Sequence, residues 1–437
     1  MAPEGNYAGA AGLMYKWKEN EGYDESDNYL ILSGGDMWSG PAISTWFKGE
    51  SMVEVMNAMD YDAAAIGNHE FDFTVEVLEQ RLPEQNFPLL ASNFVMTETG
   101  EIPDFASPYI IKEIDGVKVG IIGLASQSTP TSTFPANVEG YQFTNYAAAV
   151  GKYATEARKD GATVLIVVGH ICSGEMNSLL PVAQDNGICF IGGGHCHQHY
   201  IDRSNNVVLL QAESNMQAYG IVEFDYSPID STTLNFEYEI VENTGAGTDP
   251  EIKGIVQYWE GETDKELSEQ IAYTDVSIGQ TSPEMRNMVC DSWLYKFPDA
   301  DVALTNGGGI RQGISEGEVT LRTIVGVLPF ENDIVKLELT GEQLKEVALS
   351  GDICMGGMTT IDGFYLADGS EINDETIYNV LTIDYLYLRD DYKFSTFDPD
   401  PINTYIHYRE PLIDWMKSIN TSIVDPLSNY LDYVSRR

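Results

Sequence analysis

The chain has 437 residues, with 24 basic and 68 acidic side chains and a formal net charge of −44 at pH 7. A surface this negative repels nucleic-acid polymers and anionic membranes, so neither is an expected partner. No segment reaches the roughly 18 uninterrupted apolar residues of a transmembrane helix, and the length is typical of two domains. The five cysteines are odd in number and lack a Cys-x-x-Cys pair, which predicts no disulfide framework.

The first half of the chain alternates predicted strands and helices. A helix is expected over residues 8–17, and a second presents one apolar face made of Met52, Val53, Val55, Met56 and Met59. Strands are expected at 29–32, 63–66, 117–124, 164–168 and 188–191, followed by a strand-rich stretch over 207–240 that would complete a second sheet. This alternation predicts a layered α/β sandwich.

Four of these apolar runs lead directly into glycines and polar side chains. Residues 29–32 precede Asp36, residues 63–66 precede Asn68, His69 and Asp72, residues 164–168 precede His170, and residues 188–191 precede His195 and His197. Four of the six histidines therefore lie in predicted strand-end loops. Ligands of open α/β sheets bind at the carboxyl ends of strands, so we expect these side chains to converge on one site.

The side chains in these loops predict a site for two metal ions. Asp, Asn and His provide oxygen and nitrogen ligands that suit zinc, manganese or iron, and they do not indicate a soft thiolate site. Two divalent ions about 3.5–4 Å apart share an anionic ligand and clamp a phosphoryl group, and Asp36 is the predicted bridge. Cys196 alternates with the two flanking histidines and is predicted to pack rather than to bind metal.

The second half of the chain begins after the turn-like run 243–250. We expect a first domain over 1–245, a linker over 246–270 with a helix at 252–270, and a second domain over 271–437. In the second domain, a strand at 302–305 leads into Asn306-Gly307-Gly308-Gly309-Ile310-Arg311, a glycine-rich turn with one fixed cation. The segments 328–332 and 339–341 follow in order.

These ordered motifs resemble the 5′-nucleotidase family, which joins a calcineurin-like metallophosphoesterase domain to a nucleotide-binding domain. The resemblance covers nearly the whole chain. It implies a four-layer αββα sandwich followed by a second α/β domain. It further implies two bound divalent ions, zinc, manganese or similar, and a small nucleotide as substrate.

The resemblance also implies a role for individual residues. Asp36 corresponds to the bridging aspartate, Asn68, His170 and His195 to ligands of one ion, and His197 to a ligand of the other. His69 corresponds to the catalytic histidine, and its spacing from Asp72 is compatible with a hydrogen bond that fixes the imidazole tautomer. In the second domain the implied nucleotide-binding residues are Asn306, Gly308, Arg311, Phe330 and Tyr392, of which Phe330 and Tyr392 would stack on the base.

One departure from the family concerns the first metal ion. Members of the family open with a strand ending in Asp-x-His, and no Asp-x-His occurs in this chain. The helix expected at 8–17 resembles the one that follows that motif, so the first strand is expected to be missing rather than mutated. Either the sequence starts inside a longer gene product, or the protein has lost half of one metal site.

A second departure concerns the base pocket. The family has a glycine-rich stretch before the second aromatic residue, whereas this chain has Leu388-Arg389-Asp390-Asp391 before Tyr392. Near residue 280 the family often places an arginine that this chain lacks. Arg286 could supply that cation, or it could be an exposed surface arginine.

Together these features predict hydrolysis of nucleoside 5′-monophosphates by metal-activated water, with the substrate held between the two domains. Three alternatives stay open: a phosphodiesterase or sugar-nucleotide hydrolase, a thiosulfohydrolase, and a nucleotide-binding protein with an incomplete, inactive centre. The acidity also favours an exported protein, periplasmic, extracellular or on the cell surface. The sequence does not indicate an oligomeric state.

Overall fold

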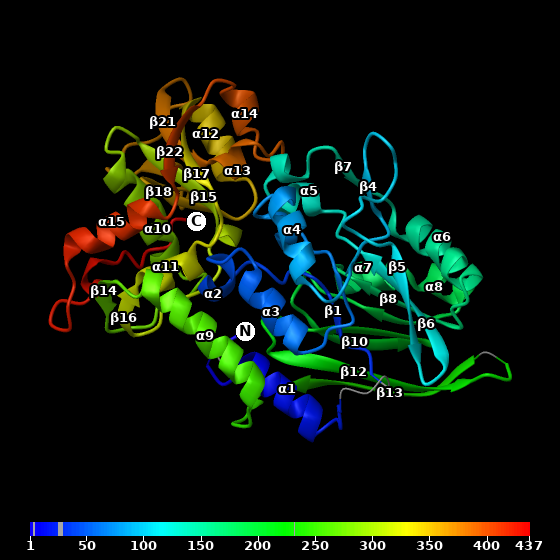
Figure 1. Cartoon of the computed structure of the whole chain (residues 1–437). Coiled ribbons are helices and arrows are strands. Elements are labelled where there is room, and N and C mark those ends of the chain that lie inside the picture. The colour runs from blue at the N-terminus through cyan, green and yellow to red at the C-terminus, as the bar shows by residue number, and fades with distance from the viewer. Residues whose placement is uncertain (3–4, 25–28, 231) are drawn as a thin grey trace. The chain divides into compact units, whose positions relative to one another are not determined.

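The computed structural model describes residues 1–2, 5–24, 29–230 and 232–437 and divides into two compact units (Figure 1). Unit 1 comprises Met1–Ser39 and Phe47–Gly261, and unit 2 comprises Gly40–Trp46 and Glu262–Arg437. The division falls within helix α9 (Pro250–Leu267), which covers most of the predicted linker helix.

Unit 1 begins with a small parallel sheet whose strands end beside the candidate ligands. Its order is β1 (Leu32–Ser33), β2 (Ala63–Ala65) and β3 (Leu89–Leu90), with α3 (Glu50–Ala58) and α4 (Val75–Arg81) in the connections. The predicted apolar face at 52–59 is buried, as expected for a helix that covers a sheet. The first helix, α1, spans Gly9–Glu19.

The central strands of a larger sheet in unit 1 are buried on both faces. Its order is β10 (His199–Ser204), β11 (Val207–Ala212), β9 (Ile188–Gly192), β8 (Val164–Gly169), β6 (Val117–Leu124) and β5 (Tyr109–Ile114). Along β8, Val164, Ile166 and Val168 face a core shared with the small sheet. Leu165 and Val167 face α6 (Tyr146–Lys159) and α8 (Leu180–Asn186). The layers helix, sheet, sheet and helix confirm the predicted αββα sandwich.

The end of unit 1 differs from the prediction that residues 207–240 complete the second sheet. Only β11 joins it, and β12 (Ala218–Ser227) pairs with β13 (Thr232–Glu242) in a separate two-stranded sheet (Figure 1). The two strands pair with each other along a long hairpin, while Phe236 still packs into the core between the sheets. Smaller elements complete the unit: β4 (Phe94–Met96), β7 (Tyr141–Phe143), α5 (Thr129–Ser132) and α7 (Ser173–Ser178).

Unit 2 is built on a five-stranded mixed sheet. Its order is β18 (Ile353–Gly356), β15 (Val302–Asn306), β21 (Ile377–Ile383), β17 (Asp333–Thr340) and β22 (Ile402–His407). Its helices are α2 (Ala42–Thr45), α10 (Pro283–Lys296), α11 (Leu321–Val327), α12 (Gly341–Ala348), α13 (Asp384–Tyr387), α14 (Phe394–Phe397) and α15 (Glu410–Ile419). The pairs β14 (Gln270–Thr274) with β16 (Gly317–Thr320) and β19 (Met358–Thr359) with β20 (Tyr365–Leu366) complete it. One large apolar core lies within the unit.

Nothing in the described part of the chain forms a helix that is both long and apolar enough to cross a membrane.

The stability of unit 2 is expected to depend on pH through Asp384. Burial raises the pKa of this carboxyl from 3.8 to about 6 and outweighs the hydrogen bonds from the backbone N–H groups of Asp333 and Tyr385, which lower it. The folded protein therefore keeps a proton that the unfolded chain releases, so stability should fall by about 2 kcal/mol as pH rises from about 4 to about 6. Denaturant unfolding across this range should show a loss of stability that is smaller by about 2 kcal/mol in Asp384→Asn than in wild type. Parallel profiles for the two proteins would contradict it.

Candidate active site

Loops from both sheets of unit 1 bring the predicted ligands together. Asp36 follows β1 with a backbone φ of 60°, and its Oδ2 lies 2.9 Å from Nε2 of His170, which follows β8. Nδ1 of His195, after β9, lies 3.0 Å from the same Nε2. Ligand atoms of Asp36, His170 and His195 all lie within 4.8 Å of one another. Asp36, His170 and His195 therefore converge, as expected from their positions after strand ends.

Asn68 completes this cluster. Its Oδ1 lies 3.2 Å from Nε2 of His170, while its Nδ2 donates to the carbonyl of Ser132 at 3.1 Å. The bond to Ser132 uses the amide nitrogen, so the amide oxygen faces the cluster. Nδ1 of His170 lies 2.7 Å from the carbonyl oxygen of Gly34, to which it donates, leaving Nε2 as the inward nitrogen.

The cluster fits a divalent cation. Oδ2 of Asp36, Oδ1 of Asn68 and Nδ1 of His195 all face the single Nε2 of His170, and one proton on that nitrogen cannot serve all three contacts. Burial alone would raise the pKa of Asp36, but the imidazoles of His170 and His69 outweigh it and hold that pKa well below its usual range. Burial acts to lower the pKa of His170, but the Asp36 carboxylate raises it. A cation would take the place of that proton.

His69 and Asp72 form a hydrogen-bonded pair beside the cluster. Nδ1 of His69 lies 2.7 Å from Oδ2 of Asp72. Asp72 also accepts hydrogen bonds from Ser39 at 2.5 Å and Thr133 at 3.1 Å. Nε2 of His69 therefore points the other way, 4.0 Å from Oδ2 of Asp36. The pair has the arrangement expected of an oriented acid, base or charge-stabilising imidazole.

Glu70 is a site residue to which the sequence assigned no role. Its fully buried carboxylate accepts backbone N–H bonds from Asp36 at 2.9 Å, Met37 at 2.5 Å and Gly67 at 2.6 Å. Burial, reinforced by Asp36, raises the pKa of Glu70 to about 7. Glu70 ties the Asp36 turn to the loop after β2. A side chain on Gly67 would collide with Oδ1 of Asp36, which explains the glycine there.

His197 lies apart from the converging ligands. It is exposed and has a φ of 51°, two residues beyond His195 in the same loop. The group of converging ligand atoms contains Asp36, His170 and His195 but not His197.

The cysteines correct the sequence prediction. Cys172 and Cys196 form a disulfide with their Cα atoms 5.3 Å apart, so the expectation of no disulfide, and of a packing role for Cys196, was wrong. These residues are 24 positions apart in the sequence and meet because β8 and β9 are adjacent parallel strands. Counting cysteines cannot detect such a long-range pair. Cys189, Cys290 and Cys354 are buried free thiols.

The glycine-rich turn of unit 2 groups several predicted nucleotide-binding residues. Nη1 of Arg311 donates to the carbonyl of Gly308 at 3.3 Å, and its guanidinium carbon lies 5.8 Å from the ring centroid of Phe330. Asn306 ends β15, and its buried Oδ1 has no hydrogen-bond partner among the described residues. The turn thus presents a cation, an aromatic ring and an unused acceptor.

Tyr392 lies in the core of unit 2 instead of beside an open pocket. Its side chain is 8% exposed, and the guanidinium of Arg389 lies 5.3 Å from its ring centroid. A ring this buried offers little face to a base. Arg286 is also not a free surface cation, because it forms a two-pronged ion pair with Asp352 at 2.6 and 2.9 Å.

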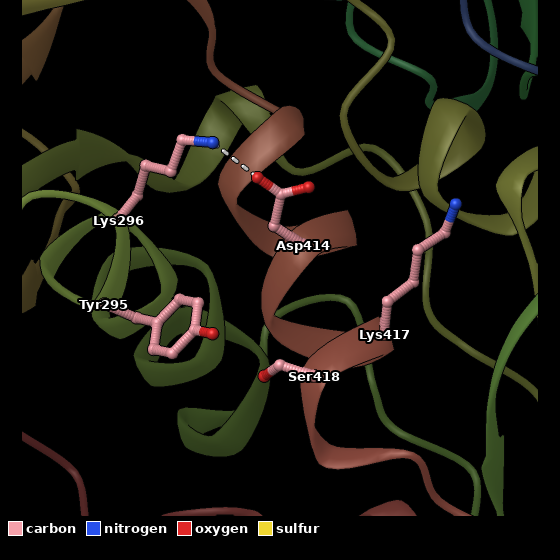
Figure 2. Close-up of a pocket in the computed structure, with 5 residues that line it drawn as sticks. All are labelled: Tyr295, Lys296, Asp414, Lys417 and Ser418. Carbon is pink, nitrogen blue, oxygen red and sulfur yellow. Dashed lines mark hydrogen bonds and ion pairs between the residues drawn. The ribbon is translucent and has the colours of Figure 1, made fainter.

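A separate pocket of unit 2 lies between α10 and α15 (Figure 2). It is lined by Tyr295, Lys296, Asp414, Lys417 and Ser418. Lys296 pairs with Asp414 at 2.6 Å, and Lys417 pairs with Glu269 at 2.6 Å. Since both cations are already paired, the pocket is a poor phosphate site, and it contains none of the predicted site residues.

Comparison with known proteins agrees with these features. Residues 261–351 match the family described as 5′-nucleotidase, C-terminal domain. The chain is 29% identical to Endonuclease YhcR of Bacillus subtilis over 400 residues, which cover 82% of this chain and 32% of that protein. It is 26% identical to the 5′-nucleotidase of Bos taurus over 359 residues, which cover 72% and 62%. The chain therefore spans about a third of the first relative and less than two thirds of the second.

Solved structures show the same fold. A 5′-nucleotidase precursor from Thermus thermophilus matches with a TM-score of 0.83 at 20% identity, covering 98% of this chain and 93% of that one. The sulfate thiohydrolase SoxB of the same species matches with a TM-score of 0.75 at 16% identity, covering 95% and 81%. The αββα sandwich, the matching C-terminal segment and these relatives agree with the similarity to the 5′-nucleotidase family that the motifs predicted.

Proposed function

We propose that this protein is a metal-dependent phosphoric monoester hydrolase that releases phosphate from nucleoside 5′-monophosphates. The observation that carries the proposal is the convergence of Asp36, Asn68, His170 and His195 beside the His69–Asp72 pair. The name 5′-nucleotidase of the Bos taurus relative supports the choice of substrate.

Different residues of unit 1 would bind the metal ions and contact the phosphate. Asp36, Asn68, His170 and His195 would hold a divalent ion, and His197 would contribute to a second. Such ions neutralise the phosphate and activate water for in-line attack. Asp72 holds Nδ1 of His69, so that Nε2 can donate a hydrogen bond to the phosphoryl oxygens as their charge develops.

Unit 2 would bind the nucleoside part of the substrate. Asn306 and Arg311 offer hydrogen bonds, Gly308 lets the turn approach the ligand, and Phe330 offers a ring face for stacking. Tyr392 supports this region from the core.

We also place the protein outside the cytoplasm. Relatives include a cell wall protein of Listeria monocytogenes and a snake venom 5′-nucleotidase. The Cys172–Cys196 disulfide agrees with an oxidising compartment.

Phosphate release from a panel of substrates tests the proposal. The panel contains nucleoside 5′-monophosphates, a bis-nitrophenyl phosphate diester, a sugar nucleotide and a thiosulfonate, each with zinc or manganese present. We expect the monophosphates to be hydrolysed with the highest kcat/KM. A faster diester or thiosulfonate reaction would favour the activities suggested by the names of YhcR and SoxB. Tight nucleotide binding without hydrolysis would indicate an inactive binding protein.

The two predicted metal ions are expected to bind with different affinities. Four protein ligands surround one position, which is the usual number for tightly held zinc. His197 is exposed and outside that group, so a second ion should be weakly held. Elemental analysis after gentle purification should therefore give about one ion per chain. Two tightly held ions would show that further ligands exist.

The base-stacking role predicts a substrate-dependent effect of Phe330→Ala. Nucleotide binding should weaken by roughly 1–3 kcal/mol, because one stacking face is lost. Hydrolysis of nitrophenyl phosphate, which has no base, should be nearly unchanged. Phe297→Ala is a matched control, since Phe297 is also half-buried in unit 2 with a cation, Lys336, 4.7 Å from its ring centroid. Equal losses on both substrates would assign Phe330 to the core alone.

A further inference from the structure

The only disulfide recorded in the described residues joins the two loops that carry metal-ligand histidines. Cys172 comes two residues after His170, and Cys196 comes directly after His195. The bond therefore links loops at the ends of β8 and β9 beside the metal cluster. Its position differs from that of Cys189, Cys290 and Cys354, which are free and buried.

The loop that carries His195 is anchored chiefly at its ends. Gly194 donates a backbone hydrogen bond to Ile171 at 3.1 Å where the loop begins, and Glu213 donates to Gln198 at 3.0 Å where it ends. Between them, His195 and His197 both have left-handed φ values, 67° and 51°, which cost non-glycine residues free energy. A covalent link at Cys196 restrains the middle of this loop.

His195 itself makes few contacts that could fix its position. Its Nδ1 lies 3.0 Å from Nε2 of His170, and its Nε2 lies 3.3 Å from Oγ of Ser128. The disulfide at the neighbouring Cys196 adds a covalent restraint to these two contacts.

We propose that the Cys172–Cys196 disulfide is a positioning element of the metal centre. It holds His195 within ligand distance of His170 and Asp36, so its removal accelerates metal loss beyond any effect on fold stability. The inference rests on the proposed metal-dependent function.

The test uses the full chain loaded with zinc. The double variant Cys172→Ser/Cys196→Ser should release zinc to a chromophoric chelator about 10–100-fold faster than wild type, the range found when a ligand loses its support. Cys189→Ala controls for loss of a buried thiol in the same unit. Val150→Ala, in the core between α6 and the large sheet, controls for lowered stability. Melting temperatures of the metal-free wild type and of the three variants measure how much stability each variant has lost.

Release at the wild-type rate, or no faster than Val150→Ala at an equal loss of melting temperature, would overturn the proposal. So would alkylation of all five cysteines in the denatured, unreduced protein, since only Cys189, Cys290 and Cys354 should react. A wild-type protein that holds no divalent ion would overturn the proposed function as well. Unchanged release from a double variant, when wild type holds zinc, would overturn the disulfide's role alone.

Discussion

Replacing His69 with alanine is expected to lower turnover of a nucleoside monophosphate by about 10²–10⁴-fold, the range for a positioned acid, base or charge-stabilising group. The reason is geometric: Asp72 holds Nδ1, and Nε2 points toward the centre without joining the group of converging ligands. Steady-state kinetics should show the loss in kcat, while elemental analysis shows unchanged metal content.

His199→Ala is the matched control for this change. His199 lies exposed on β10 and pairs with Glu213 at 2.9 Å, so its loss should leave kcat close to wild type. Loss of metal from His69→Ala would make His69 a ligand and would contradict the assigned role.

Glu70→Ala is expected to produce the largest loss of stability. The change leaves three backbone donors, those of Asp36, Met37 and Gly67, without their acceptor in a fully buried position. Each unsatisfied donor costs about 1–3 kcal/mol, so the sum approaches the whole stability of a typical domain, about 5–15 kcal/mol. Glu70→Gln keeps the size and one acceptor oxygen and should cost less.

Denaturant unfolding of the metal-free protein measures this effect apart from metal binding. Glu101→Ala, on an exposed turn, is the control and should change the free energy of unfolding by less than about 0.5 kcal/mol. If Glu70→Ala unfolds like Glu101→Ala, water or another acceptor satisfies the three N–H groups in place of the carboxylate, and the proposed link between the two loops is wrong.

The strands that the sequence predicted well are the long buried ones. Strand β6 spans Val117–Leu124 as expected, and β8 and β9 each extend one residue beyond the predicted run. Their apolar residues are contiguous because both faces are buried, which makes the signal strong. Strand β1 is different: the predicted run at 29–32 contributes only its last residue to Leu32–Ser33. A short edge strand leaves little pattern to detect.

The features that the sequence did not reveal depend on long-range or backbone contacts. The disulfide joins residues 24 positions apart, and no local pattern records which strands become neighbours. Glu70 acts through three backbone N–H groups, which nearly every residue possesses and no motif marks. The burial of Tyr392 follows in part from Arg389, a bulky residue in a stretch where the family has glycines, whose guanidinium lies over the ring.

The candidate ligands come from two different sheets, since Asp36 and Asn68 follow strands of the small sheet whereas His170 and His195 follow strands of the large one. A bound cation would therefore act as a cross-link between the layers of the sandwich, added to the apolar core between them. A ligand that binds only the folded state stabilises it by about 2.7 kcal/mol at a free concentration of about 100 times Kd. The thermal tolerance of this protein would then be set by the free metal of its surroundings as well as by its sequence.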